Sequence, residues 1–173
     1  MHLQFRRFAG CPVCNLHLRG VLNRQAEISA AGICEVVLFH SSAEELRLYA
    51  PGLPSKVVAD PDKQLYREFG VESGRRALLD PRAYAPIVRA VASTLMQVAR
   101  GREPLHNPSG EGGRLGLPAD FLIGPDGRLL ACKYGEYLDD QWSVEALLEL
   151  AKRHQFGVAT NTVDAGTSSG AVC

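Results

Sequence analysis

The sequence predicts a single α/β domain in which helices flank a central mixed β-sheet. Short runs of β-branched and aromatic residues alternate with stretches of helical periodicity, which is typical of βαβ units and parallel strands. A Gly-Pro-Asp-Gly turn at residues 124–127 then joins two further strands as an antiparallel hairpin. The 173 residues are enough for one domain with a proper hydrophobic core.

Composition and charge exclude several classes of protein. Apolar residues make up 46% of the chain and charged residues 22%, which are values of a globular protein rather than of a disordered one. Lys plus Arg and Asp plus Glu each number 19, so no cationic field favours a nucleic-acid partner. No apolar run approaches the roughly 18 residues that cross a membrane. Residues 1–10 lack the apolar stretch of a secretory signal, and we expect a cytoplasmic protein with no membrane partner.

Strands and helices alternate in the first seventy residues. Ser41 or Ser42 is a good N-cap, and Asp60-Pro61-Asp62 is a good helix start. From such signals we expect strands at 3–8, 33–39 and 56–59, and helices at 12–31, 42–50 and 60–69.

An inserted helix and a long loop then interrupt this alternation. Apolar residues at helical spacing predict a helix at 82–100, and the loop at 101–117 is rich in Gly and Pro. Together they form an insertion at about 71–117, and a loop of this length is usually functional or mobile. The hairpin strands 120–123 and 129–134 and a helix at 142–154 complete a domain of residues 1–155. The tail 156–173 consists mainly of Gly, Ser, Thr and Ala, and we expect it to be disordered.

A pair of cysteines stands where the first strand turns into the first helix. A Cys-Pro-Val-Cys motif there, at residues 11–14, is the layout of a thioredoxin-like fold. At a helix start, unpaired amides and the helix dipole stabilise a thiolate on Cys11 and lower its pKa below the free value of roughly 8.5. Pro12 is tolerated there because its missing N–H has no helical partner. Cys14 lies one turn later, close enough to attack a disulfide that Cys11 has formed.

An X-Pro pair directly before the hairpin strand completes the predicted site. Thioredoxin-like proteins place a cis-proline at this point beside the dithiol. We therefore expect Pro118 to be cis and the backbone of Leu117 to be free to pair with a substrate. The full prediction is a thioredoxin-like fold with a helical insertion before the cis-proline strand.

Four segments together resemble the alkyl hydroperoxide reductase/thiol-specific antioxidant (AhpC/TSA) superfamily. The closest likeness is to its peroxiredoxin-like branch with a C-x-x-C motif, over roughly residues 3–154. The resemblance implies that Cys11 attacks, that Cys14 resolves and that Pro118 is the cis-proline. It also implies a peroxide or disulfide substrate, a thioredoxin- or glutathione-type electron donor, and no metal or organic cofactor. The four segments are Phe8-Ala9-Gly10-Cys11-Pro12-Val13-Cys14, the strand Val36-Val37-Leu38-Phe39, Asp60-Pro61, and the stretch from Leu117 to Gly127.

Two positions depart from the peroxiredoxin pattern. Phe8 stands where peroxiredoxins have a Thr or Ser that hydrogen-bonds the peroxide, and Leu117-Pro118 supplies no Arg to polarise it. Dithiol–disulfide exchange needs only the residues present, whereas peroxide reduction needs an arginine from elsewhere in space. The candidates for that arginine are Arg6, Arg7 and Arg114.

Other interpretations of these residues stay open. The fold can serve as a non-catalytic, redox-responsive binding or chaperone-like module, with the inserted helix as its partner surface. The dithiol can also be structural, or form a zinc site with His17 and His40. The apolar stripe of the inserted helix fits core or a homodimer face better than a lid.

We expect packing roles for most of the remaining candidates. His17 is predicted to be a half-exposed surface residue that modulates the thiolate at most, and Trp142 to be a packing residue. Cys34 and Cys132 have apolar neighbours and are expected to be buried in strands, and Cys173 to be exposed in the tail.

Overall fold

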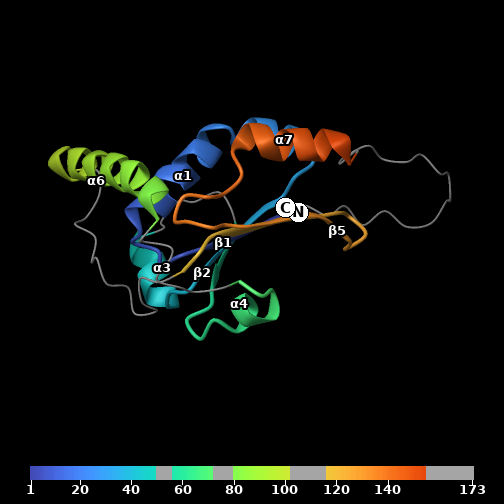
Figure 1. Cartoon of the computed structure of the whole chain (residues 1–173), viewed down its shortest axis with the longest axis horizontal. Coiled ribbons are helices and arrows are strands. Elements are labelled where there is room, and N and C mark those ends of the chain that lie inside the picture. The colour runs from blue at the N-terminus through green and yellow to red at the C-terminus, as the bar shows by residue number, and fades with distance from the viewer. Residues whose placement is uncertain (50–55, 72–79, 102–115, 155–173) are drawn as a thin grey trace.

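The described strands form one mixed β-sheet in the order β3-β2-β1-β4-β5 (Figure 1). The structure is a computed structural model that describes residues 1–49, 56–71, 80–101 and 116–154. β1, β2 and β3 run parallel, β4 is antiparallel to β1, and β5 is antiparallel to β4. The strands are β1 (His2–Arg6), β2 (Glu35–Phe39), β3 (Lys56–Ala59), β4 (Ala119–Ile123) and β5 (Leu129–Tyr134).

Helices cover both faces of this sheet. In Figure 1, α1 and α7 lie above the sheet, α4 lies below it, and α6 projects at the side beyond α1. The thioredoxin-like fold predicted from the sequence is therefore confirmed. The helices are α1 (Pro12–Asn23), α2 (Gln25–Ala30), α3 (Ala43–Tyr49), α4 (Gln64–Glu68), the 3₁₀ turn η1 (Pro81–Ala83), α6 (Tyr84–Ala99) and α7 (Val144–Arg153).

Two helices differ from the expected spans. The first predicted helix is interrupted at Arg24, whose backbone leaves the helical region and separates α1 from α2. The helix expected to start at Asp60 begins at Gln64, because the Asp60 carboxylate accepts the backbone N–H groups of Gln64 and Leu65, both at 2.9 Å. Ser42 caps α3 as expected, since its hydroxyl accepts the N–H of Glu45. The break at residues 51–52, the loop 102–115 and the tail lie outside the described residues.

The lower face of the sheet is an aromatic core. Phe5 of β1 contacts Tyr66 edge-on with ring centroids 4.9 Å apart, and it also contacts Phe69 and Phe121. The Tyr66 hydroxyl donates to the backbone carbonyls of Arg6 and Leu38. This hydroxyl therefore anchors α4 beneath the ends of the two central strands.

The upper face of β1 is polar, although α1 and α7 cover it. Successive residues of a strand point to opposite faces, so His2, Gln4 and Arg6 share the face opposite Phe5. Arg6 is fully buried and donates to Asp120 of β4 at 2.7 Å and to the Gln4 side chain at 2.6 Å. His2 bonds Glu35 of β2 at 3.0 Å. The central strand is thus joined to both neighbours by buried polar side chains as well as by the backbone ladder.

This network also positions α7. The second oxygen of Asp120 accepts the backbone N–H of Trp142, at 2.9 Å, just before the helix begins. Trp142 packs with the core cluster beneath α7, as expected from the sequence. Asp120 therefore connects the centre of the sheet to the helix that covers it.

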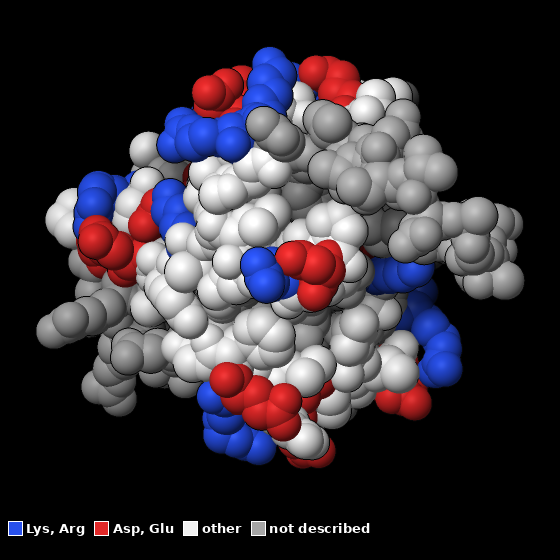
Figure 2. Space-filling view, turned by 90° about the vertical axis from the view of Figure 1, so that its right-hand side faces the viewer, with Lys and Arg blue, Asp and Glu red and all other residues white. Residues whose placement is uncertain are grey.

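The surface carries no strong charge of one sign on the side shown in Figure 2, where acidic and basic side chains are interspersed. This agrees with the net charge of zero. None of the described helices combines the length and apolar character that crossing a membrane requires.

We predict that Asp120→Asn lowers the free energy of unfolding by about 3–5 kcal/mol, because it leaves the Arg6 guanidinium buried without a charged partner. The exposed Asp62→Asn is the matched control and should change stability by less than about 0.5 kcal/mol. Urea denaturation at pH 7 measures both. Equal stability of wild type and Asp120→Asn would contradict this account.

The Arg6–Asp120 ion pair also contributes to the way the free energy of unfolding falls at acidic pH. Burial opposes ionisation of Asp120, but Arg6 and the hydrogen bond from His2 outweigh it and hold the pKa of this carboxyl below its usual range. Its contribution to stability is therefore complete above the unfolded pKa of about 3.9 and is lost as the pH falls towards the folded value. We expect the loss of stability below pH 4 to be shallower in Asp120→Asn than in Asp62→Asn.

Candidate active site

Cys11 occupies the N-cap position of α1. Its backbone is extended, with φ −70° and ψ 115°, and Pro12 is the first residue of the helix. The Cys11 N–H donates to the Phe8 carbonyl at 3.0 Å, and the Cys11 carbonyl accepts the Asn15 N–H at 3.0 Å, which begins the helical ladder. The sequence predicted this position for Cys11, and the sulfur lies where the first amides of the helix are unpaired.

Four donors around the Cys11 sulfur favour its thiolate. The Cys14 thiol has the largest effect, and Arg7 and the backbone N–H groups of Cys14 and Val13 add to it. Burial alone would favour the neutral thiol. The donors outweigh burial and lower the pKa of Cys11 to about 6, so the sulfur is ionised at neutral pH.

Arg7 is the charged donor among these groups. Its Nη1 lies 3.7 Å from the Cys11 Sγ, and both side chains are buried. Its guanidinium also lies over the Phe8 ring, 5.5 Å from the centroid. Of the three arginines proposed from the sequence, Arg7 reaches the sulfur, Arg6 is bound to Asp120, and Arg114 lies outside the described residues.

Cys14 has the opposite character. It donates its proton to the Cys11 sulfur, and this bond together with burial raises the pKa of Cys14 well above its usual value. At neutral pH the pair therefore consists of one thiolate and one thiol in contact. In this state the Cys11 sulfur is a nucleophile, whereas the Cys14 sulfur stays protonated.

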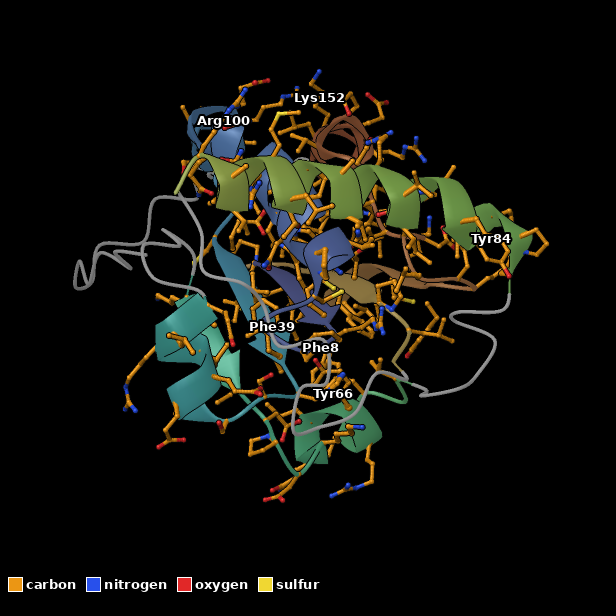
Figure 3. All side chains as sticks on the ribbon, turned by 90° about the vertical axis from the view of Figure 1, so that its left-hand side faces the viewer. Phe8, Phe39, Tyr66, Tyr84, Arg100 and Lys152 are labelled. Carbon is orange, nitrogen blue, oxygen red and sulfur yellow. The ribbon has the colours of Figure 1, made fainter. Side chains whose placement is uncertain are left out.

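The dithiol lies beneath a cover of apolar side chains. Cys11 is 1% exposed and Cys14 is 3% exposed. Both belong to a buried cluster with Ala83, Ala90 and Leu138, against which Ile87 also packs. Figure 3 shows α6 running across the outside of the molecule from Tyr84 to Arg100, with Phe8 below it.

The model of a known protein family matches most of the chain. The model of the AhpC/TSA antioxidant enzymes matches residues 22–137, which is more than half of the chain. The chain belongs to this family. The matched segment begins after the dithiol, so the roles of Cys11 and Cys14 rest on their own geometry.

The crystal structure of a putative thiol:disulfide interchange protein DsbE from Chlorobium tepidum is similar over 90% of this chain and 79% of its own, with 17% sequence identity and a TM-score of 0.49. No curated protein matches the sequence.

His40, which the sequence suggested only as a zinc ligand, is a buried residue whose backbone N–H donates to the Arg7 carbonyl. His40 follows β2 and is 1% exposed, and neither ring nitrogen has a hydrogen-bond partner among the described residues. Burial lowers its pKa to about 4, so the ring is neutral at pH 7. A Cβ on Gly116 would lie 3.2 Å from His40 Nε2 and 3.4 Å from Arg7 Cγ. Gly116 therefore lies against both His40 and Arg7, and of these three residues Arg7 reaches the Cys11 sulfur.

The expected cis-proline is wrong, because no described peptide bond is cis and Leu117–Pro118 is trans. The two isomers of an X-Pro bond differ by only about 0.5–1 kcal/mol, so surrounding structure decides between them. Here the Pro118 carbonyl accepts the Gly135 N–H at 2.8 Å and extends the pairing of β4 with β5. Pro118 is buried and Leu117 is half-buried. Gly116, directly before them, lies against Arg7 and His40.

Neither of the two cysteines expected to be buried in strands is buried, and the ring of His17 is more buried than expected. Cys132 is exposed rather than buried, because β5 is the last strand of the sheet and is paired on one side only. His17 is half-buried as a residue, but its Nε2 is buried and has no hydrogen-bond partner in the described part of the chain. Burial, together with Arg6, lowers the pKa of His17 to about 3, so it is a neutral residue between α1 and the sheet. Cys34 is half-buried before β2, and Cys173 lies outside the described residues.

A zinc site is not assembled within the described residues. No group of three or more His, Cys, Asp or Glu side chains there is arranged to hold a metal ion. The contacts of Cys11 are instead those of a thiolate held by N–H groups and by a second thiol.

We predict that Arg7→Met raises the pKa of Cys11 from about 6 towards the free value of roughly 8.5, because one positive charge is removed from the thiolate. The rate of alkylation of Cys11 by iodoacetamide at pH 6.5 should fall severalfold, and its midpoint should move to higher pH. Fragment-ion mass spectrometry follows the reaction at Cys11, because fragments that end between Cys11 and Cys14 tell their labels apart. Arg47→Met, at an exposed arginine of α3, should leave the profile unchanged.

Proposed function

We propose that this chain is a thiol–disulfide oxidoreductase of peroxiredoxin-like type that uses the Cys11/Cys14 dithiol to reduce disulfide or peroxide substrates. The contact of an ionised Cys11 with a protonated Cys14, at the start of α1 and beside Arg7, carries the proposal. A thioredoxin- or glutathione-type donor would return two electrons and two protons to the oxidised pair. The cytoplasm, where such donors keep thiols reduced, is the compartment that we propose for it.

With a disulfide, the reaction consists of two exchanges. The Cys11 thiolate attacks one sulfur of the substrate, forms a mixed disulfide and expels the other sulfur as a thiolate, which takes up a proton. Cys14 then loses its proton and attacks the Cys11 sulfur. The remaining substrate sulfur leaves as a thiolate, and the Cys11–Cys14 disulfide forms. Two electrons have then passed from the dithiol to the substrate.

Arg7 favours a hydroperoxide as a second class of substrate. Attack of the Cys11 thiolate on the terminal oxygen breaks the O–O bond, gives a sulfenic acid on Cys11 and expels an alkoxide that takes up a proton. Cys14 then attacks this sulfur and releases water as the disulfide forms. The Arg7 guanidinium, 3.7 Å from the sulfur, supports this step, because a positive charge there would stabilise the negative charge that develops on the peroxide oxygen.

We expect Cys11→Ser to abolish turnover with both substrate classes, because no other described cysteine shares its environment. Cys14→Ser should instead complete the first exchange and accumulate a mixed disulfide at Cys11, which intact-protein mass spectrometry detects after addition of a small disulfide. Cys132→Ser is the matched control and should keep wild-type turnover. Full activity of Cys11→Ser would exclude this chemistry, and a lack of turnover by the wild type with either class would favour the non-catalytic binding module.

Stopped-flow mixing with hydrogen peroxide separates the two substrate classes. If Arg7 polarises the peroxide, reduced wild type is oxidised faster than a free thiol of the same pKa, and Arg7→Met falls to the free-thiol rate. Rates are compared at a pH where the Cys11 thiol is fully ionised in both proteins, so that the change in its pKa does not affect the comparison. Wild-type oxidation at the free-thiol rate would eliminate the peroxide role and leave disulfide exchange.

A further inference from the structure

A pocket of about 300 Å³ lies where α1, α6 and the beginning of α7 meet. In Figure 1 this is the side of the sheet that α1 and α7 cover. Its lining includes Leu16, His17 and Val21 of α1, Arg89 of α6 and Val144 of α7. The volume is at the lower end of the range of small-molecule sites. Neither cysteine of the dithiol lines this pocket, so it is not the site already described.

One side chain of the lining has a buried polar atom that lacks a partner. The Nε2 of His17 is shielded from solvent and has no hydrogen-bond partner among the described residues. The ring is neutral at pH 7, because burial lowers the pKa of His17 to about 3. A buried polar atom without a partner is rare and costly, since it has lost its hydrogen bond to water. A polar group of a bound molecule would supply the missing bond.

Two opposite charges of the lining lie near each other without forming an ion pair. Arg89 is exposed on α6, and no described residue forms an ion pair with it. Asp139, between β5 and α7, is half-buried and accepts the side-chain N–H of Gln141 at 3.1 Å. Burial raises the pKa of Asp139, and Arg89 is close enough to oppose this rise. The space between the guanidinium and the carboxylate therefore fits a group that contacts both.

The other charged residues of the lining are already paired. Arg24 forms an ion pair with Glu27 at 2.8 Å and another with Glu145 at the start of α7. Arg89 and Asp139 are thus the charges left for a ligand. A simple anion would leave the Asp139 carboxylate without a charged partner, and a simple cation would leave the guanidinium without one. The pocket therefore favours a molecule that carries both charges.

The positions of His17 and Asp139 define where the positive end of such a molecule would lie. Burial dominates the pKa of both side chains, and the buried guanidinium of Arg6 also acts on both, so the two lie near the same group. An ammonium group between them would donate to the Asp139 carboxylate and to His17 Nε2, and such charge-assisted bonds are strong.

An apolar wall determines the rest of the ligand. Leu16, Val21 and Val144 form this wall, and the two valines are only 3% and 8% exposed. An aliphatic group fits here, because both apolar surfaces leave water when they meet.

We propose that this pocket binds a free aliphatic α-amino acid, with its carboxylate at Arg89, its ammonium group between Asp139 and His17, and its side chain on the apolar wall. The bound molecule would contact α1, α6 and the connection into α7 at once. This site is separate from the dithiol and goes beyond the proposed function.

Isothermal titration calorimetry with L-leucine at pH 7 tests the proposal. A ligand of about nine non-hydrogen atoms should bind with a dissociation constant of about 0.1–1 mM. Two probes of similar shape lack one charge each: L-leucinamide has no carboxylate, and 4-methylpentanoate has no ammonium group. Each should bind about tenfold more weakly than leucine. No binding of leucine, or binding of either probe as tight as that of leucine, would overturn the proposal.

Variants of the two charges locate the site. Arg89→Gln and Asp139→Asn should each weaken the binding of leucine by about tenfold, because each removes one charged partner. Arg100→Gln, at the exposed end of α6, and the exposed Asp62→Asn are the matched controls and should leave the dissociation constant unchanged. Wild-type affinity in Arg89→Gln or Asp139→Asn would contradict this site. Because the readout is heat of binding rather than turnover, the site can fail while the dithiol chemistry holds, or the reverse.

The ring of His17 gives a readout that needs no variant in the pocket. In nitrogen-15 NMR of the histidine rings, the His17 Nε2 signal should move as leucine is added, because this atom gains a hydrogen bond. His154 is exposed after α7 and does not line the pocket, so its signals are the internal control and should stay in place. A His17 signal that leucine leaves unchanged would contradict the proposal.

Discussion

The site depends on keeping a negative sulfur inside the protein. Burial alone would leave Cys11 a neutral thiol, and the chain opposes this with helix amides, a neighbouring thiol and the Arg7 guanidinium. The amides act only because the helix begins at the next residue, Pro12, and Arg7 acts only because β1 ends one residue before Arg7. Stabilising the thiolate stabilises the reduced form, which makes the disulfide a stronger oxidant.

Arg6 and Arg7 are neighbours in the chain but have different partners, because their side chains leave the end of β1 in different directions. Arg6, the last residue of β1, points into the polar layer beneath α1 and is bound to Asp120. Arg7 lies beyond the strand and reaches Cys11. Exchanging their roles would require a one-residue shift of β1, which would turn every side chain of the strand to the opposite face. The buried network that maintains this register therefore also keeps Arg7 beside the sulfur.

Much of the fold could be predicted because its signals are local. The strand at 56–59 has the predicted ends, and the Gly-Pro-Asp-Gly turn produces the expected hairpin. The positions where helices begin, at Pro12 and near Ser42, follow from side-chain and backbone chemistry within one turn. Where prediction failed, the deciding partner was distant: Pro118 is trans where its carbonyl pairs with Gly135, and Cys132 is exposed because no strand follows β5 in the sheet.

The sequence by itself determined the dithiol, its place at a helix start and the order of strands and helices, because each follows from residues that are neighbours in the chain. Only the tertiary structure decided which arginine meets the thiolate, that His40 and Gly116 lie against that arginine, and that α6 packs in one cluster with the two cysteines. Those contacts join residues about thirty to more than one hundred positions apart, or depend on the direction in which a side chain leaves the end of a strand. Such directions are settled by packing, which local sequence patterns do not record.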